Sequence, residues 1–196
     1  MMYSKEYRLA VFMVPKVCTY SIGRALGSAG FAWYSPVKEI EDLKHTSMVA
    51  RCMEDCPFVK DYRRASFVRH PETRLASGWR WLRGINHVPC VGDFPDFVEQ
   101  LCGGEITDRV IYWDVGVSQT RHLYDEGRLL VDRVGKFENL QQDWLEMLRW
   151  AGVPEVPLDH VNASGPPMDY QELYNPALRE RVRQHFAEDY ENFDYC

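Results

Sequence analysis

Residues Arg8–Leu26 read RLAVFMVPKVCTYSIGRAL, an apolar run that breaks into a polar turn and resumes at helical spacing. The run 9–14 has the length of one buried strand, and the apolar residues of 22–26 recur on one face of a helix. A strand that turns directly into a helix leaves unpaired N–H groups at the helix start, where the helix dipole adds partial positive charge. The stretch therefore predicts an anion-binding loop at residues 15–21.

The side chains of this loop suit a phosphate or a similar anion. Lys16 supplies a full positive charge, and Thr19 and Ser21 supply hydroxyl donors. The common nucleotide-triphosphate loop, G-x-x-x-x-G-K-[ST], has two glycines and places its lysine at the end. Here the lysine comes first and no glycine appears until Gly23, so the loop is expected to be of another kind.

Composition indicates an acidic globular protein. The 196 residues carry a formal net charge of −6, with 45% hydrophobic and 27% charged residues, which favours a single domain over 1–196. An acidic chain binds nucleic acid and anionic membranes poorly, so its anion site must be a local basic pocket. Since no apolar run is long enough to span a bilayer and residues 1–8 lack the apolar core of a signal peptide, we expect a cytoplasmic protein without nucleic-acid or membrane partners.

The six cysteines are expected to be reduced thiols, scattered and buried, because no export signal accompanies them. The alternative is a structural zinc site built from His45, Cys52, Cys56, His87 and Cys90. Their C-x3-C and H-x2-C spacings are loose and no second C-x2-C pair is present, so no metal is expected.

Strands and helices alternate along the chain, which predicts an α/β fold of three layers, with a mainly parallel central sheet flanked by helices. After the first strand and helix, we expect strands at 31–34, 65–69 and 129–137. Helices are expected at 45–53, with Thr46 as N-cap, and at 71–84, 94–101, 138–151 and 176–190. Leu75, Trp79 and Leu82 recur at helical spacing and define a core face of the helix at 71–84.

Two of the expected strand-to-helix junctions carry a basic residue. Lys16 follows the first strand, and Arg69 ends the strand at 65–69. In a parallel α/β sheet both junctions open at the carboxyl edge of the strands, where ligands bind. Two anion sites on one edge suit a ligand with phosphates at two ends.

These residues resemble those of sulfotransferases. Pro15-Lys16-Val17-Cys18-Thr19-Tyr20-Ser21 is similar to their 5′-phosphosulfate loop. FVRHPETRLAS, residues Phe67–Ser77, resembles their 3′-phosphate motif, in which an arginine that ends a strand and a serine further on hold the 3′-phosphate. The stretch Leu130–Trp144, the segment His160–Ser164 and the closing residues 190–195 are similar to carbohydrate sulfotransferases of the Golgi-enzyme superfamily and their bacterial relatives.

The resemblance implies a P-loop-like fold that transfers a sulfuryl group from 3′-phosphoadenosine 5′-phosphosulfate (PAPS) to an acceptor hydroxyl. By this resemblance, Lys16 stabilises the departing 5′-phosphate, so that the reaction needs no metal ion. Arg69 and Ser77 are implied to bind the 3′-phosphate. Asn162 and Ser164 are further donor-binding candidates by the same resemblance. The implied partners are PAPS, its product adenosine 3′,5′-bisphosphate (PAP) and the acceptor, which is a carbohydrate or small molecule by analogy alone.

His45 occupies the place, between the two phosphate motifs, where relatives often carry a histidine. A histidine suits a general base because its pKa lies near working pH, although an exposed histidine without a role is the alternative. His70, His87 and His122 are weaker candidates, and Arg74 is expected to be a structural salt-bridge partner.

Two other functions remain open at this point. A small-molecule kinase on a P-loop-type fold would require ATP and Mg²⁺, and the absent glycines of the triphosphate loop count against it. A non-catalytic binding module would keep the nucleotide-binding site but would not catalyse a transfer reaction.

Overall fold

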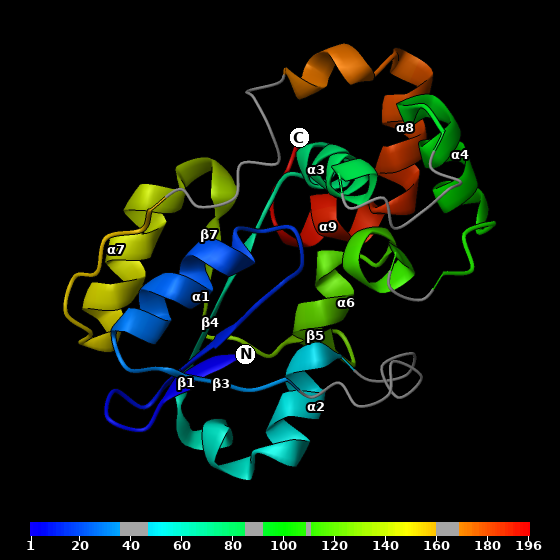
Figure 1. Ribbon diagram of the computed structural model, residues 1–196. Coiled ribbons are helices and arrows are strands. Elements are labelled where there is room, and N and C mark those ends of the chain that lie inside the picture. The colour runs from blue at the N-terminus through cyan, green and yellow to red at the C-terminus, as the bar shows by residue number, and fades with distance from the viewer. Residues whose placement is uncertain (36–46, 85–91, 109–110, 160–168) are drawn as a thin grey trace. The chain divides into compact units, whose positions relative to one another are not determined.

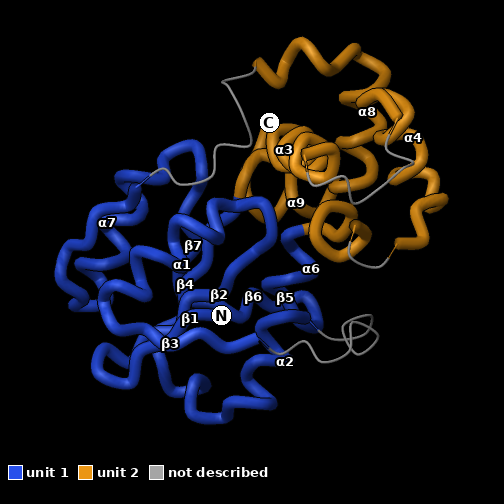
Figure 2. The backbone as a smooth tube through the Cα atoms, viewed as in Figure 1, with its two compact units in different colours: residues 1–68, 119–161 blue, residues 69–118, 162–196 orange. Residues whose placement is uncertain are grey.

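The computed structural model describes residues 1–35, 47–84, 92–108, 111–159 and 169–196. The chain forms two compact units, shown in different colours in Figure 2. Unit 1 consists of Met1–Val68 and Gln119–Val161, and unit 2 of Arg69–Ser118 and Asn162–Cys196. Each unit is thus assembled from two separate segments of sequence. The expectation of a single domain over 1–196 stays a prediction.

Unit 1 is built on a five-stranded sheet in the order β3-β1-β2-β4-β7. Figure 1 labels β1, β3, β4 and β7 of this sheet. Its strands are β1 (Met2–Ser4), β2 (Leu9–Phe12), β3 (Ala32–Trp33), β4 (Arg63–Val68) and β7 (Arg133–Lys136). β2 pairs parallel with β4 and β4 parallel with β7, whereas β1 is antiparallel to both of its neighbours. All strands of this sheet except β1 therefore run in the same direction, which confirms the predicted mainly parallel sheet.

Helices flank this sheet, as the sequence predicts. The helices of unit 1 are α1 (Thr19–Ser28), α2 (Met48–Asp55), α6 (Gln119–Leu123) and α7 (Leu140–Ala151), with the short 3₁₀ turns η2 (Pro57–Asp61) and η4 (Phe137–Asn139). Helices α2 and α6 pack against each other. α7 contacts β7, and α1 contacts β1 and β3. All four residues of β2 are buried, which fits a strand of the sheet interior that is covered on both faces.

Unit 2 is helical in its described residues. It contains α3 (Pro71–Gly84), α4 (Phe94–Gly103), the π-helical turn η3 (Tyr112–Gly116), the 3₁₀ turn η5 (Tyr170–Leu173), α8 (Pro176–His185) and α9 (Ala187–Asn192). Leu75, Trp79 and Leu82 of α3 are buried in its hydrophobic core, as their spacing predicts. No helix within the described ranges is long and apolar enough to cross a bilayer.

The prediction of a single strand at 129–137 is wrong, because this segment contributes to two strands. β6 (Arg128–Leu129) instead forms a hairpin with β5 (Tyr124–Asp125), and β7 begins at Arg133. Glu126 and Gly127 both have positive φ, of 47° and 76°, which suits a two-residue hairpin turn between β5 and β6. The chain leaves that hairpin before it joins the main sheet.

Four smaller predictions also need correction. The helix predicted at 176–190 breaks at Phe186, which is buried in the core with φ −106° and ψ 27°. The N-cap of α2 is Ser47, whose hydroxyl accepts a hydrogen bond from the backbone N–H of Ala50, and not Thr46. The strand predicted at 65–69 begins at Arg63 and ends at Val68, and β1 was not expected at all.

Candidate functional site

The loop between β2 and α1 adopts a constrained backbone. Lys16 and Cys18 have positive φ angles of 64° and 54°, a left-handed conformation that costs a non-glycine residue about 1–2 kcal/mol. Val17 between them is buried, whereas Lys16 is half-buried. The buried valine anchors the loop while the lysine stays accessible. Because such backbone conformations gather at functional sites, this geometry supports a binding role for the loop.

The start of α1 keeps its positive potential. Its N-cap residue, Cys18, makes no side-chain capping hydrogen bond, and the first turn contains no acidic residue. A carboxylate there would neutralise the partial positive charge of the helix N-terminus. The loop therefore combines backbone N–H groups, a helix dipole and the Lys16 ammonium, which together favour an anion.

The hydroxyl-bearing residues of this helix start differ in exposure. Tyr20 is 57% exposed, Thr19 is half-buried, and Ser21 is only 2% exposed. Thr19 and Tyr20 are therefore more accessible to solvent than Ser21, and the binding roles of residues 15–21 stay predictions.

The second basic junction, at the start of unit 2, is ordered by hydrogen bonds. Arg69 directly follows the last residue of β4 and is 7% exposed. Its Nε donates to the hydroxyl of Thr73 (3.0 Å), and this hydroxyl donates to the backbone carbonyl of His70 (3.1 Å). The ring of Tyr170 lies across the guanidinium, 5.6 Å from its central carbon to the ring centroid.

Ser77 lies on the same face of α3 as Thr73. The two residues are four positions apart, and residues at that spacing are neighbours on a helix surface. Thr73 binds the Arg69 guanidinium, and Ser77 lies one helical turn further along the same face. The assignment of Arg69 and Ser77 to a 3′-phosphate stays a prediction.

Arg74 is 1% exposed and interacts with acidic groups of unit 2. Burial lowers the pKa of this guanidinium to about 10, opposed by the charges of Asp189 and Asp114, while Arg69 lowers it further. Its Nη2 also donates to the backbone carbonyl of Asp114 (3.4 Å). These contacts agree with the expected structural role.

The candidate bases occupy different environments. His45 lies outside the described residues, as do His87, Asn162 and Ser164. The His70 ring packs edge-on against Tyr190 and Tyr195 in unit 2, with Nε2 3.3 Å from the backbone carbonyl of Cys196. His122 is fully buried in unit 1.

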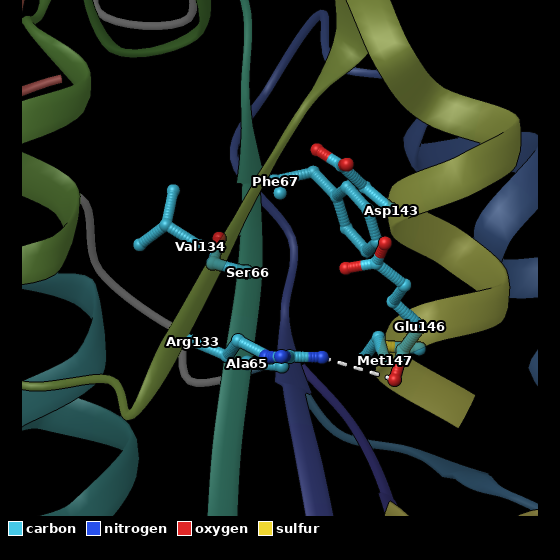
Figure 3. Close-up of a pocket in the computed structure, with 9 residues that line it drawn as sticks. Ala65, Ser66, Phe67, Arg133, Val134, Asp143, Glu146 and Met147 are labelled. Carbon is cyan, nitrogen blue, oxygen red and sulfur yellow. Dashed lines mark hydrogen bonds between the residues drawn. The ribbon is translucent and has the colours of Figure 1, made fainter. Parts of the chain in front are cut away.

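A cavity of about 180 Å³ lies in unit 1 between β4, β7 and α7 (Figure 3). The Asp143 carboxylate accepts a hydrogen bond from the backbone N–H of Lys136 (2.5 Å), and Arg133 donates to the backbone carbonyl of Glu146 (3.0 Å). These polar contacts join β7 to α7. Of the predicted donor-binding residues that the structure describes, none lines this cavity. It is formed by Ala65, Ser66, Phe67, Arg133, Val134, Gly135, Asp143, Glu146 and Met147.

The cysteines differ in burial. Cys52 and Cys56 are buried as predicted, whereas Cys196 is exposed and contradicts the expectation. Burial raises the pKa of Cys52 to about 12 and that of Cys102 to about 11. Within the described ranges, no three His, Cys, Asp or Glu side chains converge on a metal-sized site, and Cys90 lies outside those ranges.

Thr73 and Tyr170 contact Arg69, which the sequence did not reveal. Thr73 lies inside the recognised motif, but no pattern distinguishes it from a solvent-exposed threonine. Tyr170 is remote in sequence from Arg69, so only the folded chain shows their contact.

The class of protein follows from the two junctions. β2 and β4 are adjacent parallel strands with Phe12 opposite Ser66, so both end at the same edge of the sheet. The Lys16 loop leaves this edge, and Arg69 is the residue after β4. The chain is thus an α/β protein with basic strand-to-helix junctions suited to an anionic group.

A family model described as "Sulfotransferase family" matches residues 1–196. The chain therefore belongs to the sulfotransferase family. This finding confirms the resemblance seen in the two motifs and supports sulfotransferase activity in general. A search of curated proteins found no match.

Proposed function

We propose that this protein transfers a sulfuryl group from PAPS to an acceptor hydroxyl. The observation that carries the proposal is the shared sheet edge at which β2 and β4 end, one followed by the strained Lys16 loop and the other by Arg69. PAPS has an anionic group at each end of its sugar, at the 5′ and the 3′ positions. The two junctions supply one basic site for each.

In the proposed reaction, the acceptor oxygen attacks the sulfur in line with the bridging oxygen of the donor. The new sulfur–oxygen bond forms as the bond from sulfur to that bridging oxygen breaks, and PAP leaves. Lys16 and the N–H groups of the loop stabilise the negative charge that grows on the bridging oxygen and the 5′-phosphate. Thr19 and Tyr20 contact the same phosphate.

Arg69 and Ser77 bind the 3′-phosphate, and the Lys16 loop binds the 5′-phosphosulfate. Asn162 and Ser164 are proposed further donor contacts. His45 is the proposed base that takes the hydroxyl proton as the oxygen attacks. The acceptor is proposed to be a carbohydrate or a small hydroxyl compound.

Calorimetric binding of PAP, compared with adenosine 5′-monophosphate (AMP) and with ATP and Mg²⁺, tests the donor site. We expect metal-independent binding that prefers PAP. Arg69→Ala should weaken PAP binding about 10- to 100-fold and leave AMP binding unchanged, because it removes charge-assisted hydrogen bonds to the 3′-phosphate alone. Lys16→Ala should weaken both ligands.

Lys60→Ala and Arg128→Ala, at exposed positions outside both junctions, serve as matched controls and should bind PAP as the wild type does. Preference for ATP with Mg²⁺ would overturn the proposal in favour of a kinase. Equal affinity of the wild type for PAP and AMP would contradict a binding site for the 3′-phosphate. Once donor binding is established, an acceptor screen with His45→Ala alongside tests the base.

A further inference from the structure

Arg69 is held from two directions by side chains of unit 2. The Thr73 hydroxyl accepts a hydrogen bond from Nε, and it is itself oriented by donating to the carbonyl of His70. A hydroxyl can do both at once, because it has one donor and two acceptor sites. The chain of contacts therefore fixes Nε relative to the first turn of α3.

The second restraint is the aromatic ring of Tyr170. Its centroid lies 5.6 Å from the guanidinium carbon, within the range of a cation–π contact. Tyr170 begins η5, whose last residue, Leu173, and the following Tyr174 pack on the core of unit 2. The Tyr174 hydroxyl donates to the backbone carbonyl of Glu72 (2.8 Å), which ties this segment to the start of α3.

We propose that Thr73 and Tyr170 are positioning residues that orient the Arg69 guanidinium toward the 3′-phosphate, an inference that rests on the proposed function. An arginine side chain otherwise loses much rotamer freedom when it binds a ligand. Holding the guanidinium through Nε and the aromatic ring before the ligand arrives lowers that cost and raises affinity.

A purely structural role would give a different result. If Thr73 and Tyr170 only stabilised unit 2, their loss would lower the thermal unfolding temperature and affect every nucleotide alike. A positioning role instead changes the ratio of PAP to AMP affinity, because only PAP has the phosphate that Arg69 binds. The ratio is therefore the diagnostic quantity.

The test measures PAP and AMP affinities of the full chain by calorimetry. Thr73→Val keeps the shape of the side chain and removes the hydroxyl, and it should weaken PAP binding about five- to tenfold with AMP unchanged. Thr73→Ser, which keeps the hydroxyl, should bind PAP as the wild type does. Tyr170→Leu should weaken PAP binding about three- to fivefold, whereas Tyr170→Phe, which keeps the ring, should bind as the wild type does.

Thr107→Val, at an exposed threonine of unit 2, is the matched control and should change neither affinity. In the Arg69→Ala background, Thr73→Val should have no further effect on PAP binding, because the group that it orients is gone. Should Thr73→Val fail to fold, the comparison of Tyr170→Leu with Tyr170→Phe still tests whether these contacts position Arg69.

The outcomes separate the two proposals. If wild type prefers PAP and loses that preference with Arg69→Ala, while Thr73→Val and Tyr170→Leu bind PAP normally, positioning is refuted and the donor site stands. If wild type shows no preference for PAP, or Arg69→Ala retains it, both proposals fail. An equal loss for PAP and AMP in the Thr73 and Tyr170 variants would assign these residues a structural role.

Discussion

Arg74 belongs to the same motif as Arg69 and Ser77 and is buried in unit 2. It is among the largest fully buried side chains, and it faces the charges of Asp189 and Asp114. Its guanidinium carbon also lies 5.9 Å from the ring of Phe186. A buried ion pair adds little net stability, but removing one partner leaves the other charge buried and uncompensated. Asp189 is also fully buried in unit 2, in the helix α9 that follows the break at Phe186.

Arg74→Met should destabilise the protein by about 3–5 kcal/mol, because Asp189 stays buried without its cation. Urea unfolding followed by circular dichroism measures the change. The double variant Arg74→Met with Asp189→Leu should recover most of the loss, since both charges are then absent. A loss below about 1 kcal/mol in the single variant would show that Asp189 does not depend on Arg74.

At the scale of elements, α3 depends on a close approach to η3. A Cβ atom at Gly78 would lie 2.5 Å from a methyl carbon of Val115, closer than real contacts allow. Both atoms belong to buried positions of unit 2. The glycine is therefore required by packing, although helix propensity alone would favour alanine by about 1 kcal/mol.

We expect Gly78→Ala to lower the free energy of unfolding by about 1–3 kcal/mol, since the added methyl overpacks the contact with Val115. Gly84→Ala is the matched control on the same helix, because a Cβ there meets no atom within 4 Å. It should be neutral or slightly stabilising. Combining Gly78→Ala with Val115→Ala should relieve the clash, and additive losses in a double-mutant cycle would contradict the packing account.

Across the whole molecule, local pattern predicted the elements that carry the two motifs. β2, α1, β4 and α3 formed where apolar periodicity and the helix-start residues placed them, because those signals lie within one segment. β1 went unpredicted because a strand of three residues gains its stability from pairing with β2 and β3, which no local pattern records. The strand at 129–137 divided because Glu126 and Gly127 turn the chain into a separate hairpin.

The candidate site was predictable to the same extent. Lys16, Arg69 and Ser77 follow from their motifs, and the structure adds the strained loop backbone and the shared helix face of Thr73 and Ser77. Tyr170 could not be found from sequence, because its contact with Arg69 arises only when η5 packs on unit 2. The roles of Lys16, Arg69, Ser77 and His45, and of the residues at 162–164, stay predictions.

Both units contain cysteine thiols and, in unit 2, tyrosine hydroxyls whose pKa is raised by burial. Desolvation raises the pKa of Cys52 in unit 1 to about 12 and that of Cys102 in unit 2 to about 11, and it also raises the pKa of Tyr174 and Tyr190. Unfolded thiols ionise near pH 8.5–9, so above that pH the unfolded chain binds fewer protons than the folded one. Stability contributed by these groups is therefore complete below about pH 8.5 and is lost as the pH rises toward the folded pKa values.

We therefore expect the free energy of unfolding to fall between pH 9 and 10.5, by up to about 1.4 kcal/mol per pH unit for each such thiol. Urea titrations at a series of pH values measure this slope. Cys52→Ala should make the slope shallower whatever it does to stability at neutral pH, because it removes one group that retains its proton in the folded state. Cys196→Ala, at an exposed position, is the control and should leave the slope unchanged. An unaltered slope in Cys52→Ala would mean that Cys52 ionises alike in the folded and unfolded chains, and the alkaline loss would then belong to the buried tyrosines and Cys102.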